Sequence, residues 1–145
     1  MPRLRDNGNL GVGHGLWGER IACEFLRAKG YEIFERNVTP YDRDRRLEID
    51  IVAYERASDT LVFVEVKQHK EHSLFGTRLR SIDKRKLRNL RIAANAWRRK
   101  NHWEEGYRFD VLEIYGTPET GMPPIVDHID GVRLFDENGK YINWR

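Results

Sequence analysis

The sequence predicts an α/β domain in which a mixed β-sheet is flanked by helices, with the elements in the order α-β-β-β-α-β-β. Two segments carry apolar residues at helical spacing, and the runs between and after them have the length and alternation of strands. The length of 145 residues fits one domain spanning 1–145. Residues 1–13 are rich in Gly, Asn and charge, and we expect them to form a flexible arm.

The first half of the chain predicts one helix and three strands. A helix is expected over 16–29, because apolar residues from Ile21 to Leu26 recur at helical spacing and Gly30 follows as a C-terminal signal. A short strand over 31–34 precedes a polar loop that contains a proline. The stretch LEIDIVAYERASDTLVFVEVK then predicts two strands that pair as a hairpin.

The second half predicts a helix followed by two strands. The helix is expected over 83–100, where four apolar residues share one face: Leu87, Leu90, Ala94 and Trp97. A polar connection containing Phe75 and Gly76 precedes it and is placed to cover the end of the hairpin, although Phe75 equally suits the core. Alternating residues over 108–116 and 125–130 predict the last strands. Such a sheet binds ligands where strand ends and loops meet.

Composition narrows the class of protein. Lys and Arg number 26 and Asp and Glu number 23, a net charge of +3, so any preference for an acidic partner depends on where the charges lie. Cys23 is the single cysteine, which excludes an internal disulfide and suits a reducing compartment. The chain has no apolar run long enough for a membrane span and no secretory signal at its start. We therefore expect a soluble, cytoplasmic protein.

Two acids and a lysine interrupt the predicted hairpin strands: Asp50, Glu65 and Lys67. Side chains alternate faces along a strand, so Glu65 and Lys67 share one face at the end of an apolar stripe. If the hairpin turn is centred on Ala57 and Ser58, paired residue numbers sum to 115 and Asp50 lies opposite Glu65. The Cβ atoms of the two acids would then be about 4.5–5.5 Å apart, which is destabilising unless a cation or a proton offsets the repulsion.

A divalent cation is the natural partner for this acidic pair. Magnesium prefers oxygen ligands and is often held by one or two carboxylates together with substrate phosphate. Asp50 and Glu65 would supply the carboxylates, with the backbone carbonyl of Val66 as a further ligand and Mg²⁺ or Mn²⁺ as the cofactor. Lys67 would then orient or deprotonate the attacking water in phosphodiester hydrolysis. The alternative is that Glu65 and Lys67 form an ordinary surface ion pair on an edge strand.

A basic segment suggests a nucleic-acid partner. Between positions 78 and 100 ten cationic residues face a single acid, Asp83; they are Arg78, Arg80, Lys84, Arg85, Lys86, Arg88, Arg91, Arg98, Arg99 and Lys100. The first seven of these, with Arg43, Arg45 and Arg46 in the loop before Asp50, are the predicted nucleic-acid-binding residues. The alternative is a solubilising helix face, which is the commoner role of charge runs.

The sequence lacks the motifs of zinc sites and of nucleotide-binding sites. His69 and His72 are three residues apart, and no cysteine pair accompanies them, so we do not expect a zinc site. The chain has no phosphate-binding G-x-x-x-x-G-K-[ST] motif, and its GVGHGLWG stretch has no preceding strand that would make it a dinucleotide fingerprint. The sequence therefore indicates no nucleotide cofactor.

Several motifs in order carry a family resemblance. WGERIACEFLRAKGYEIFERN, LEIDIVAYE, LVFVEVKQ, the lysine-rich helix with its alanines, and RFDVLEI resemble the YraN-like family of endonuclease-like proteins. That family resembles the PD-(D/E)XK superfamily of restriction-endonuclease-like proteins, near archaeal Holliday-junction resolvases. The resemblance covers about 15–131. Leu47 stands where the family usually has glycine, and Gln68 and His69 stand where it more often has threonine and arginine.

The resemblance implies a restriction-endonuclease-like core and a magnesium-dependent DNA endonuclease with Asp50, Glu65 and Lys67 in its site. It also implies a catalytic role for Glu19, whose alternative is an ordinary acid in the first turn of a helix. Branched DNA as substrate and a homodimer are expectations by analogy with related nucleases. The competing hypothesis is a nucleic-acid-binding or assembly module without catalysis, and RNA is a further candidate substrate.

Overall fold

The computed structural model describes residues 14–41, 44–70, 84–133 and 138. The expected arm over 1–13 and the connection containing Phe75 and Gly76 lie outside these residues. The described elements in chain order are α1 (His14–Ala28), β1 (Tyr31–Val38), the 3-10 helix η1 (Arg45–Leu47), β2 (Ile49–Glu55), β3 (Thr60–His69), α2 (Lys84–Lys100), β4 (Tyr107–Tyr115), the 3-10 helix η2 (Pro118–Thr120) and β5 (Ile125–Ile129).

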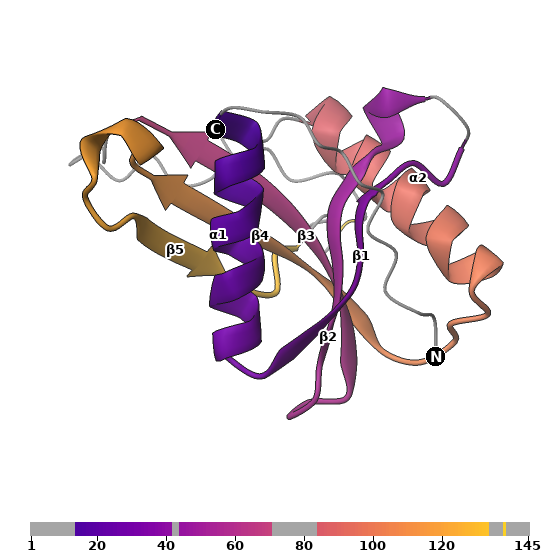
Figure 1. Cartoon of the computed structure of the whole chain (residues 1–145). Helices are drawn as coiled ribbons and strands as arrows, with labels where there is room; N and C mark the ends of the chain where they lie inside the picture. Colours follow the sequence, from indigo (N-terminus) through magenta and orange to yellow (C-terminus); the bar gives the residue numbers. More distant parts are fainter. Residues whose placement is uncertain (1–13, 42–43, 71–83, 134–137, 139–145) are drawn as a thin grey trace.

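The strands form one mixed sheet, as the sequence predicts. Five strands lie in the order β1-β2-β3-β4-β5 (Figure 1). All neighbours are antiparallel except β3 and β4, which are parallel. A parallel pair needs a crossover connection, and α2 supplies it between β3 and β4. The predicted order α-β-β-β-α-β-β is confirmed.

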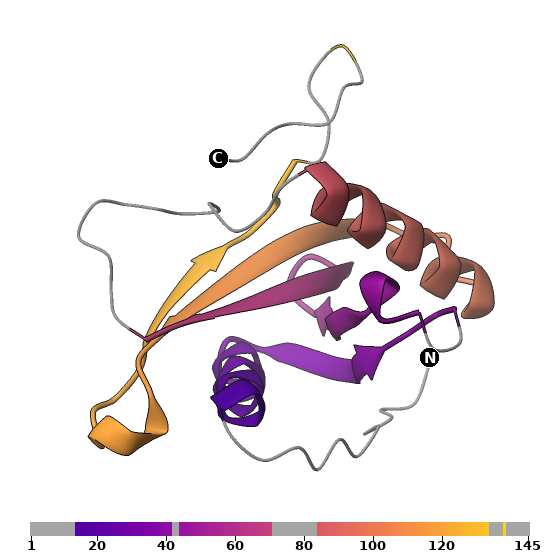
Figure 2. The same cartoon turned by 90° about the horizontal axis from the view of Figure 1, so that it is seen from above.

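The two helices cover opposite faces of the sheet (Figure 2). Ala22, Cys23 and Leu26 of α1 are buried in one core cluster with residues from β1 to β4. On the other face, Ala93 and Trp97 of α2 are buried in a second cluster with residues from β1, β2 and β3. Each helix therefore buries its apolar stripe against one face of the sheet.

The predicted hairpin register is confirmed. Residue pairs from Ile51 and Val64 to Glu55 and Thr60 follow the expected sum, and the turn lies between them. Leu61 and Phe63 belong to the core cluster under α2, while Val62 and Val64 belong to the cluster under α1. Asp50 directly precedes Ile51 and Glu65 directly follows Val64, so the two acids lie just beyond the last pair of this ladder.

The first strand is longer than predicted, so the loop expected from position 36 is wrong in its first three residues. Arg36 and Val38 pair with β2, and a bulge lies between Ile33 and Glu35. The buried carboxylate of Glu35 accepts a hydrogen bond of 3.0 Å from the indole nitrogen of Trp97. These contacts come from β2 and α2, so local strand propensity does not reveal them.

A buried ionic cluster joins β5 to β4 and β2. Asp110 is 1 % exposed and accepts hydrogen bonds from the Arg108 Nε (2.9 Å), from the His128 Nε2 (2.8 Å) and from the backbone nitrogen of Gly131 (3.0 Å). Arg108 also donates to Glu55 at 2.8 Å. Burial alone would raise the pKa of Asp110, but the bonds from His128 and Arg108 hold it below its ordinary value.

No helix in the described ranges is long and apolar enough to cross a lipid bilayer.

Candidate active site

The predicted acids and lysine lie together at one end of the sheet, on the face that α2 covers. Lys67 Nζ lies 3.4 Å from Glu65 Oε1. Asp50 reaches the same part of β3, because its Oδ2 accepts a 2.8 Å hydrogen bond from the backbone nitrogen of Val66. Only 6 % of the Glu65 side chain is exposed. The three groups therefore form a partly buried cluster around Glu65 and are not the exposed surface pair of the alternative interpretation.

A fourth charged group, Lys86 of α2, completes the cluster. Its Nζ lies 2.5 Å from Glu65 Oε1, closer than Lys67. The sequence predicted Lys86 only as one of many nucleic-acid-binding residues. A helical pattern could have distinguished it, because Lys86 lies four and eleven residues before the buried Leu90 and Trp97 and so borders the apolar stripe of α2. Lys86 therefore faces the sheet end.

The environment of the cluster disfavours the charged forms of Asp50 and Lys67. Burial, and next the charge of Glu65, raise the pKa of Asp50 well above its ordinary value. Burial, and next the hydrogen bond with Lys86, lower the pKa of Lys67. Burial opposes the charge on Lys86, but Glu65 more than offsets that effect and the pKa of Lys86 is raised. Lys86 is thus the main counter-charge of Glu65, and Lys67 holds its proton less tightly than an ordinary lysine.

The cluster opens into a pocket with a volume of about 410 Å³. Helix η1, strands β2 and β3, and the first turns of α2 line it with Arg45, Arg46, Glu48, Asp50, Glu65, Arg85, Lys86 and Asn89. Glu48 adds a further acid, and burial, followed by the charges of Glu19 and Glu65, raises its pKa although Arg45 opposes the shift. The pocket is therefore lined by both acids and cations.

Glu19 lies beside the acidic cluster but has its own partners. Its Oε1 accepts a 2.8 Å hydrogen bond from Asn37 Nδ2 and lies 3.8 Å from Arg36 Nε. The neighbouring Gly18 lets α1 approach β3, because a Cβ at position 18 would collide with the side-chain oxygen of Gln68. The side chain of Gln68, which follows Lys67 on β3, therefore lies against α1 at Gly18.

Of the predicted basic residues, Arg45, Arg46, Arg85 and Lys86 line the pocket, and Arg88 and Arg91 lie further along α2. Arg45, Arg46, Arg85, Arg88 and Arg91 are all exposed. Arg46 is paired with Asp44 at 3.0 Å, and Arg45 lies 3.9 Å from Glu48. Three predicted residues, Arg43, Arg78 and Arg80, and the side chain of Lys84 lie outside the described residues.

The cluster offers a small number of oxygen ligands for a hard divalent cation. Within the described ranges, no group of three or more His, Cys, Asp or Glu side chains has the arrangement to hold a metal ion. The available set is therefore the one that the sequence predicts: the carboxylates of Asp50 and Glu65 and the carbonyl of Val66. Oxygen donors of this number fit Mg²⁺ or Mn²⁺, which retain several waters and share their coordination with substrate phosphate.

Comparison with known proteins fixes the family. Residues 18–114 match the model of the uncharacterised protein family UPF0102. The chain belongs to UPF0102. A UPF0102 protein of Syntrophomonas wolfei is 42 % identical over 101 residues, covering 69 % of this chain and 82 % of the relative. A UPF0102 protein of Nocardia farcinica is 36 % identical over 134 residues, covering 91 % of this chain and 94 % of the relative.

The UPF0102 match confirms the resemblance to YraN-like proteins. The matched segment runs from Gly18 in α1 to Ile114 in β4. It includes Glu19, Asp50, Glu65, Lys67 and Lys86, so the whole cluster lies in the part of the chain that defines the family.

Proposed function

We propose that this UPF0102 protein is a metal-dependent endonuclease of the PD-(D/E)XK type that hydrolyses phosphodiester bonds of DNA. One observation carries the proposal. Asp50 and Glu65 lie at the end of a hairpin ladder with like charges close enough to raise the pKa of Asp50, and Lys67 lies 3.4 Å from Glu65. A buried acidic pair with an adjacent lysine destabilises the free protein and suits binding of a cation and phosphate.

The residues present fit a divalent cation. Asp50, Glu65 and the Val66 carbonyl would hold it, and when bound it would supply positive charge to the scissile phosphate and to the attacking water. Asp50 is already fixed toward β3 by its bond from Val66. Glu65 is enclosed by two lysines, so one of its cationic contacts must loosen for the carboxylate to coordinate a metal.

Lys67 and Lys86 would have different roles in the reaction. Lys67, with its lowered pKa, is suited to take or orient a proton of the attacking water and to stabilise negative charge on the phosphate. Lys86, with its raised pKa, remains a cation. Its ammonium group would contact the phosphate after it has moved away from Glu65. Both side chains are partly exposed, which leaves them accessible to a substrate.

The exposed arginines around the pocket support a polyanionic substrate. Arg85, Arg88 and Arg91 extend the basic surface along α2, and Arg45 and Arg46 extend it along η1. These contacts would hold the phosphate backbone without reading sequence. We infer DNA, with branched structures as the preferred form and a homodimer to cut both strands. Buried, unpaired Cys23 suits the reducing cytoplasm, where we place the activity.

One observation favours a non-catalytic binding module as the second candidate. The Lys86 Nζ forms an ion pair of 2.5 Å with Glu65 Oε1, so the charge of the carboxylate that a metal would need is already neutralised. A module of this kind would keep the basic surface and use the ion pair only to stabilise the fold. The two candidates differ in whether a divalent cation displaces the contact between Lys86 and Glu65.

A cleavage assay separates these functions. The purified protein is incubated with single-stranded, duplex, flap and four-way DNA, each with Mg²⁺, Mn²⁺ or EDTA. The endonuclease predicts cleavage that needs the metal and is lost in Asp50→Asn and Lys67→Met, while Glu32→Gln, an acid outside the pocket, cuts normally. DNA binding without cleavage of any of the four forms, in either metal, would favour the binding module. RNA versions of the same substrates test the preference for DNA.

A further inference from the structure

The end of β3 carries one more titratable side chain beyond Lys67. His69 lies two residues after Lys67, on the same face of the strand and about 6.6 Å further along it. The backbone of His69 is fixed to the next strand, because its carbonyl accepts a 2.8 Å hydrogen bond from the backbone nitrogen of Gly116, directly after β4. His69 therefore has a fixed place beside the proposed active site.

A buried carboxylate of β4 lies against the ring of His69. Glu113 is 1 % exposed, and its Oε1 lies 3.4 Å from His69 Nε2. Glu113 pairs with Lys67 in the parallel ladder between β3 and β4, so these side chains share one face of the sheet. Among the described residues, the buried Nε2 of His69 has no hydrogen-bond partner. Catalytic hydrogen bonds are often long in a free enzyme and tighten with substrate, so Glu113 is placed to accept a bond from this nitrogen.

Tyr115 holds both members of this pair. Its hydroxyl donates a 3.0 Å hydrogen bond to Oε2 of Glu113, the carboxylate oxygen that does not face His69. Its ring stacks on the His69 imidazole, with 4.8 Å between the centroids and 19° between the planes. Tyr115 is itself buried. The orientation of the imidazole is therefore set by two residues of β4.

The other ring nitrogen of His69, Nδ1, is left for a substrate. The side chain is 31 % exposed although Nε2 is buried, so its exposed surface lies away from Glu113. A carboxylate beside one imidazole nitrogen orients the ring and stabilises its positive charge when the ring is protonated. Both nitrogens of a protonated imidazole are donors. His69 can therefore give up a proton from Nδ1 while Nε2 stays against Glu113.

Hydrolysis of a phosphodiester moves protons at two places. The attacking water loses one, and Lys67, with its lowered pKa, is suited to take it. The leaving oxygen gains one, and it lies across the phosphorus from the water in an in-line displacement. Two side chains about 6.6 Å apart along one strand can flank a single phosphoryl group. Lys67 would then lie on the side of the water and His69 on the side of the leaving oxygen.

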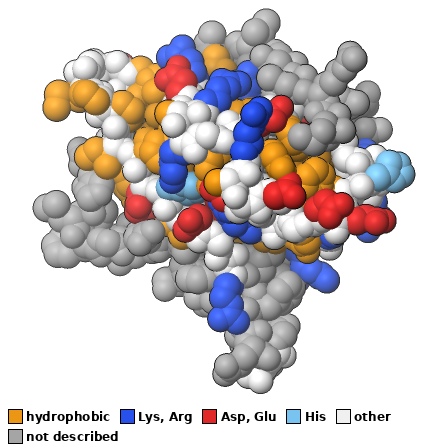
Figure 3. All heavy atoms as spheres, turned by 90° about the horizontal axis from the view of Figure 1, so that it is seen from below, with side chains coloured by type: hydrophobic (Ala, Val, Ile, Leu, Met, Phe, Trp, Pro, Cys, Tyr) orange, Lys and Arg blue, Asp and Glu red, His pale blue; other side chains and the backbone are white. Residues whose placement is uncertain are grey.

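The charges of the described surface agree with a substrate at this end of β3. Exposed Arg45, Arg46 and Arg85 line the pocket that also contains Glu65. The opposite end of the sheet, at the turn between β2 and β3, is seen from below in Figure 3, and acidic and basic side chains are interspersed there. A phosphate backbone is therefore favoured at the end that carries Lys67 and His69.

We propose that His69 is the general acid that protonates the leaving oxygen of the scissile phosphodiester, and that Glu113 is the residue that positions it. As the water oxygen bonds to phosphorus, the bond from phosphorus to the leaving oxygen breaks, and that oxygen keeps the electron pair and takes the Nδ1 proton. The ring is left neutral, with its remaining proton on Nε2 toward Glu113, and regains a proton from solvent. This inference rests on the proposed function.

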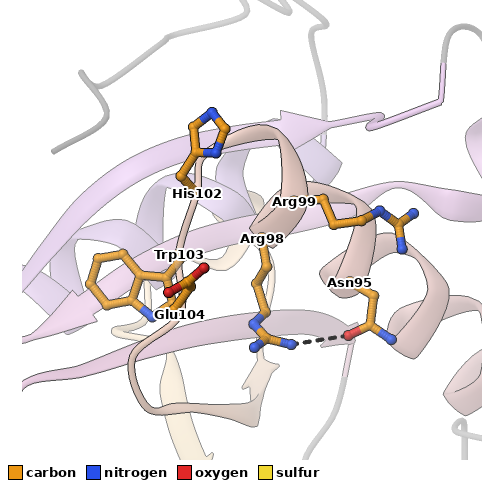
Figure 4. Close-up of a pocket in the computed structure, with 6 residues that line it drawn as sticks. All are labelled: Asn95, Arg98, Arg99, His102, Trp103 and Glu104. Atoms are coloured by element: carbon orange, nitrogen blue, oxygen red, sulfur yellow. Dashed lines mark hydrogen bonds between the residues drawn. The ribbon is translucent and has the colours of Figure 1, made fainter.

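His102 provides a matched control, because it is an exposed histidine outside the site. It lies beyond the C-terminal end of α2, sixteen residues after Lys86. It lines a separate pocket there, and its ring points in a different direction from the side chains of Arg98 and Arg99 (Figure 4). Replacing this histidine should leave the reaction unchanged.

The test compares two versions of a DNA that the wild type cuts in Mn²⁺: the ordinary phosphodiester, and one in which sulfur replaces the bridging oxygen that leaves. A thiolate is a much weaker base than an alkoxide, so its departure does not need a proton. His69→Gln and Glu113→Gln are compared with Lys67→Met and His102→Gln. Thermal unfolding checks that each variant is folded, and binding of the same DNA in EDTA separates binding from chemistry.

We expect His69→Gln to cut the ordinary DNA about 100-fold more slowly than the wild type but the sulfur version no more than about threefold more slowly, with normal binding in EDTA. Glu113→Gln should show the same pattern with a smaller loss, Lys67→Met should be slow on both versions, and His102→Gln should match the wild type. The inference alone is overturned if folded His69→Gln cuts ordinary DNA normally, or if it is slowed equally on both versions, as loss of a purely structural contact would produce. A wild-type protein that cuts neither version overturns the endonuclease and the role of His69 with it.

Discussion

Replacing Lys86 by methionine tests the ion pair at the centre of the proposed site. Methionine keeps the apolar stem and removes the charge 2.5 Å from Glu65. Removal of one partner from a fully buried pair costs about 3–5 kcal/mol. Lys67 remains 3.4 Å from the same oxygen and Lys86 is partly exposed, so we expect Lys86→Met to lower the free energy of unfolding in EDTA by a smaller amount, about 1–3 kcal/mol.

The same variant should respond more strongly to metal than the wild type. A cation that binds only the folded state stabilises it by RT ln(1 + [L]/Kd), and Kd should fall when no ammonium competes for Glu65. The assay is urea unfolding followed by circular dichroism, with EDTA and with increasing Mn²⁺. Arg85→Met, an exposed neighbour on the same helix, is the control and should change stability by no more than about 0.5 kcal/mol. Equal stability of Lys86→Met and wild type, or equal gains from Mn²⁺, would refute the reasoning.

Three further substitutions test other contacts by urea or thermal unfolding. Asp50→Asn should stabilise the metal-free protein by about 0.5–2 kcal/mol at pH 7. The raised pKa means that the ionised form of Asp50 destabilises the folded state, and this cost, and with it the gain from asparagine, should fade as the pH falls toward about 4, where the unfolded chain is also protonated. Gly18→Ala should change the free energy of unfolding by no more than about 1 kcal/mol, because its Cβ would meet the flexible end of the Gln68 side chain, which can move aside; Gly15→Ala, with nothing within 4 Å, should likewise not destabilise. Asp110→Asn should cost about 3–5 kcal/mol at pH 7, unlike exposed Asp130→Asn. Because its pKa is lowered in the folded state, that loss should shrink as the pH falls below about 4.

The hairpin could be predicted from the sequence because strand geometry leaves few choices. Alternation of apolar residues fixes which side chains share a face, and a slip by one residue would move Leu61 and Phe63 from the α2 face to the α1 face of the sheet. The same constraint brings Asp50 to the end of the ladder beside Glu65. The end of α1 could be predicted equally well, because Gly30 follows the helix and takes the left-handed conformation, with φ of 89°, that ends many helices.

The remaining part of the site depends on contacts between distant elements. Lys86 belongs to a run of cations in which composition alone does not distinguish one residue from the next, and its contact with Glu65 depends on the packing of α2 on the sheet. Glu19 is paired with Asn37, whose position requires the extension of β1 and a φ of 51°. Helical spacing could have marked Lys86 as a residue beside the apolar stripe, but the partner in each contact is brought close only by the tertiary fold.

Anomalous scattering from crystals soaked in Mn²⁺ tests the central claim most directly, because it locates the cation without knowledge of the substrate. We predict one manganese peak in contact with carboxylate oxygens of both Asp50 and Glu65, with the Lys86 ammonium moved away from Glu65. Crystals of Asp50→Asn should lack the peak. A saturating soak that leaves Lys86 on Glu65, with no peak touching either acid, would contradict the assignment of these residues as a metal site.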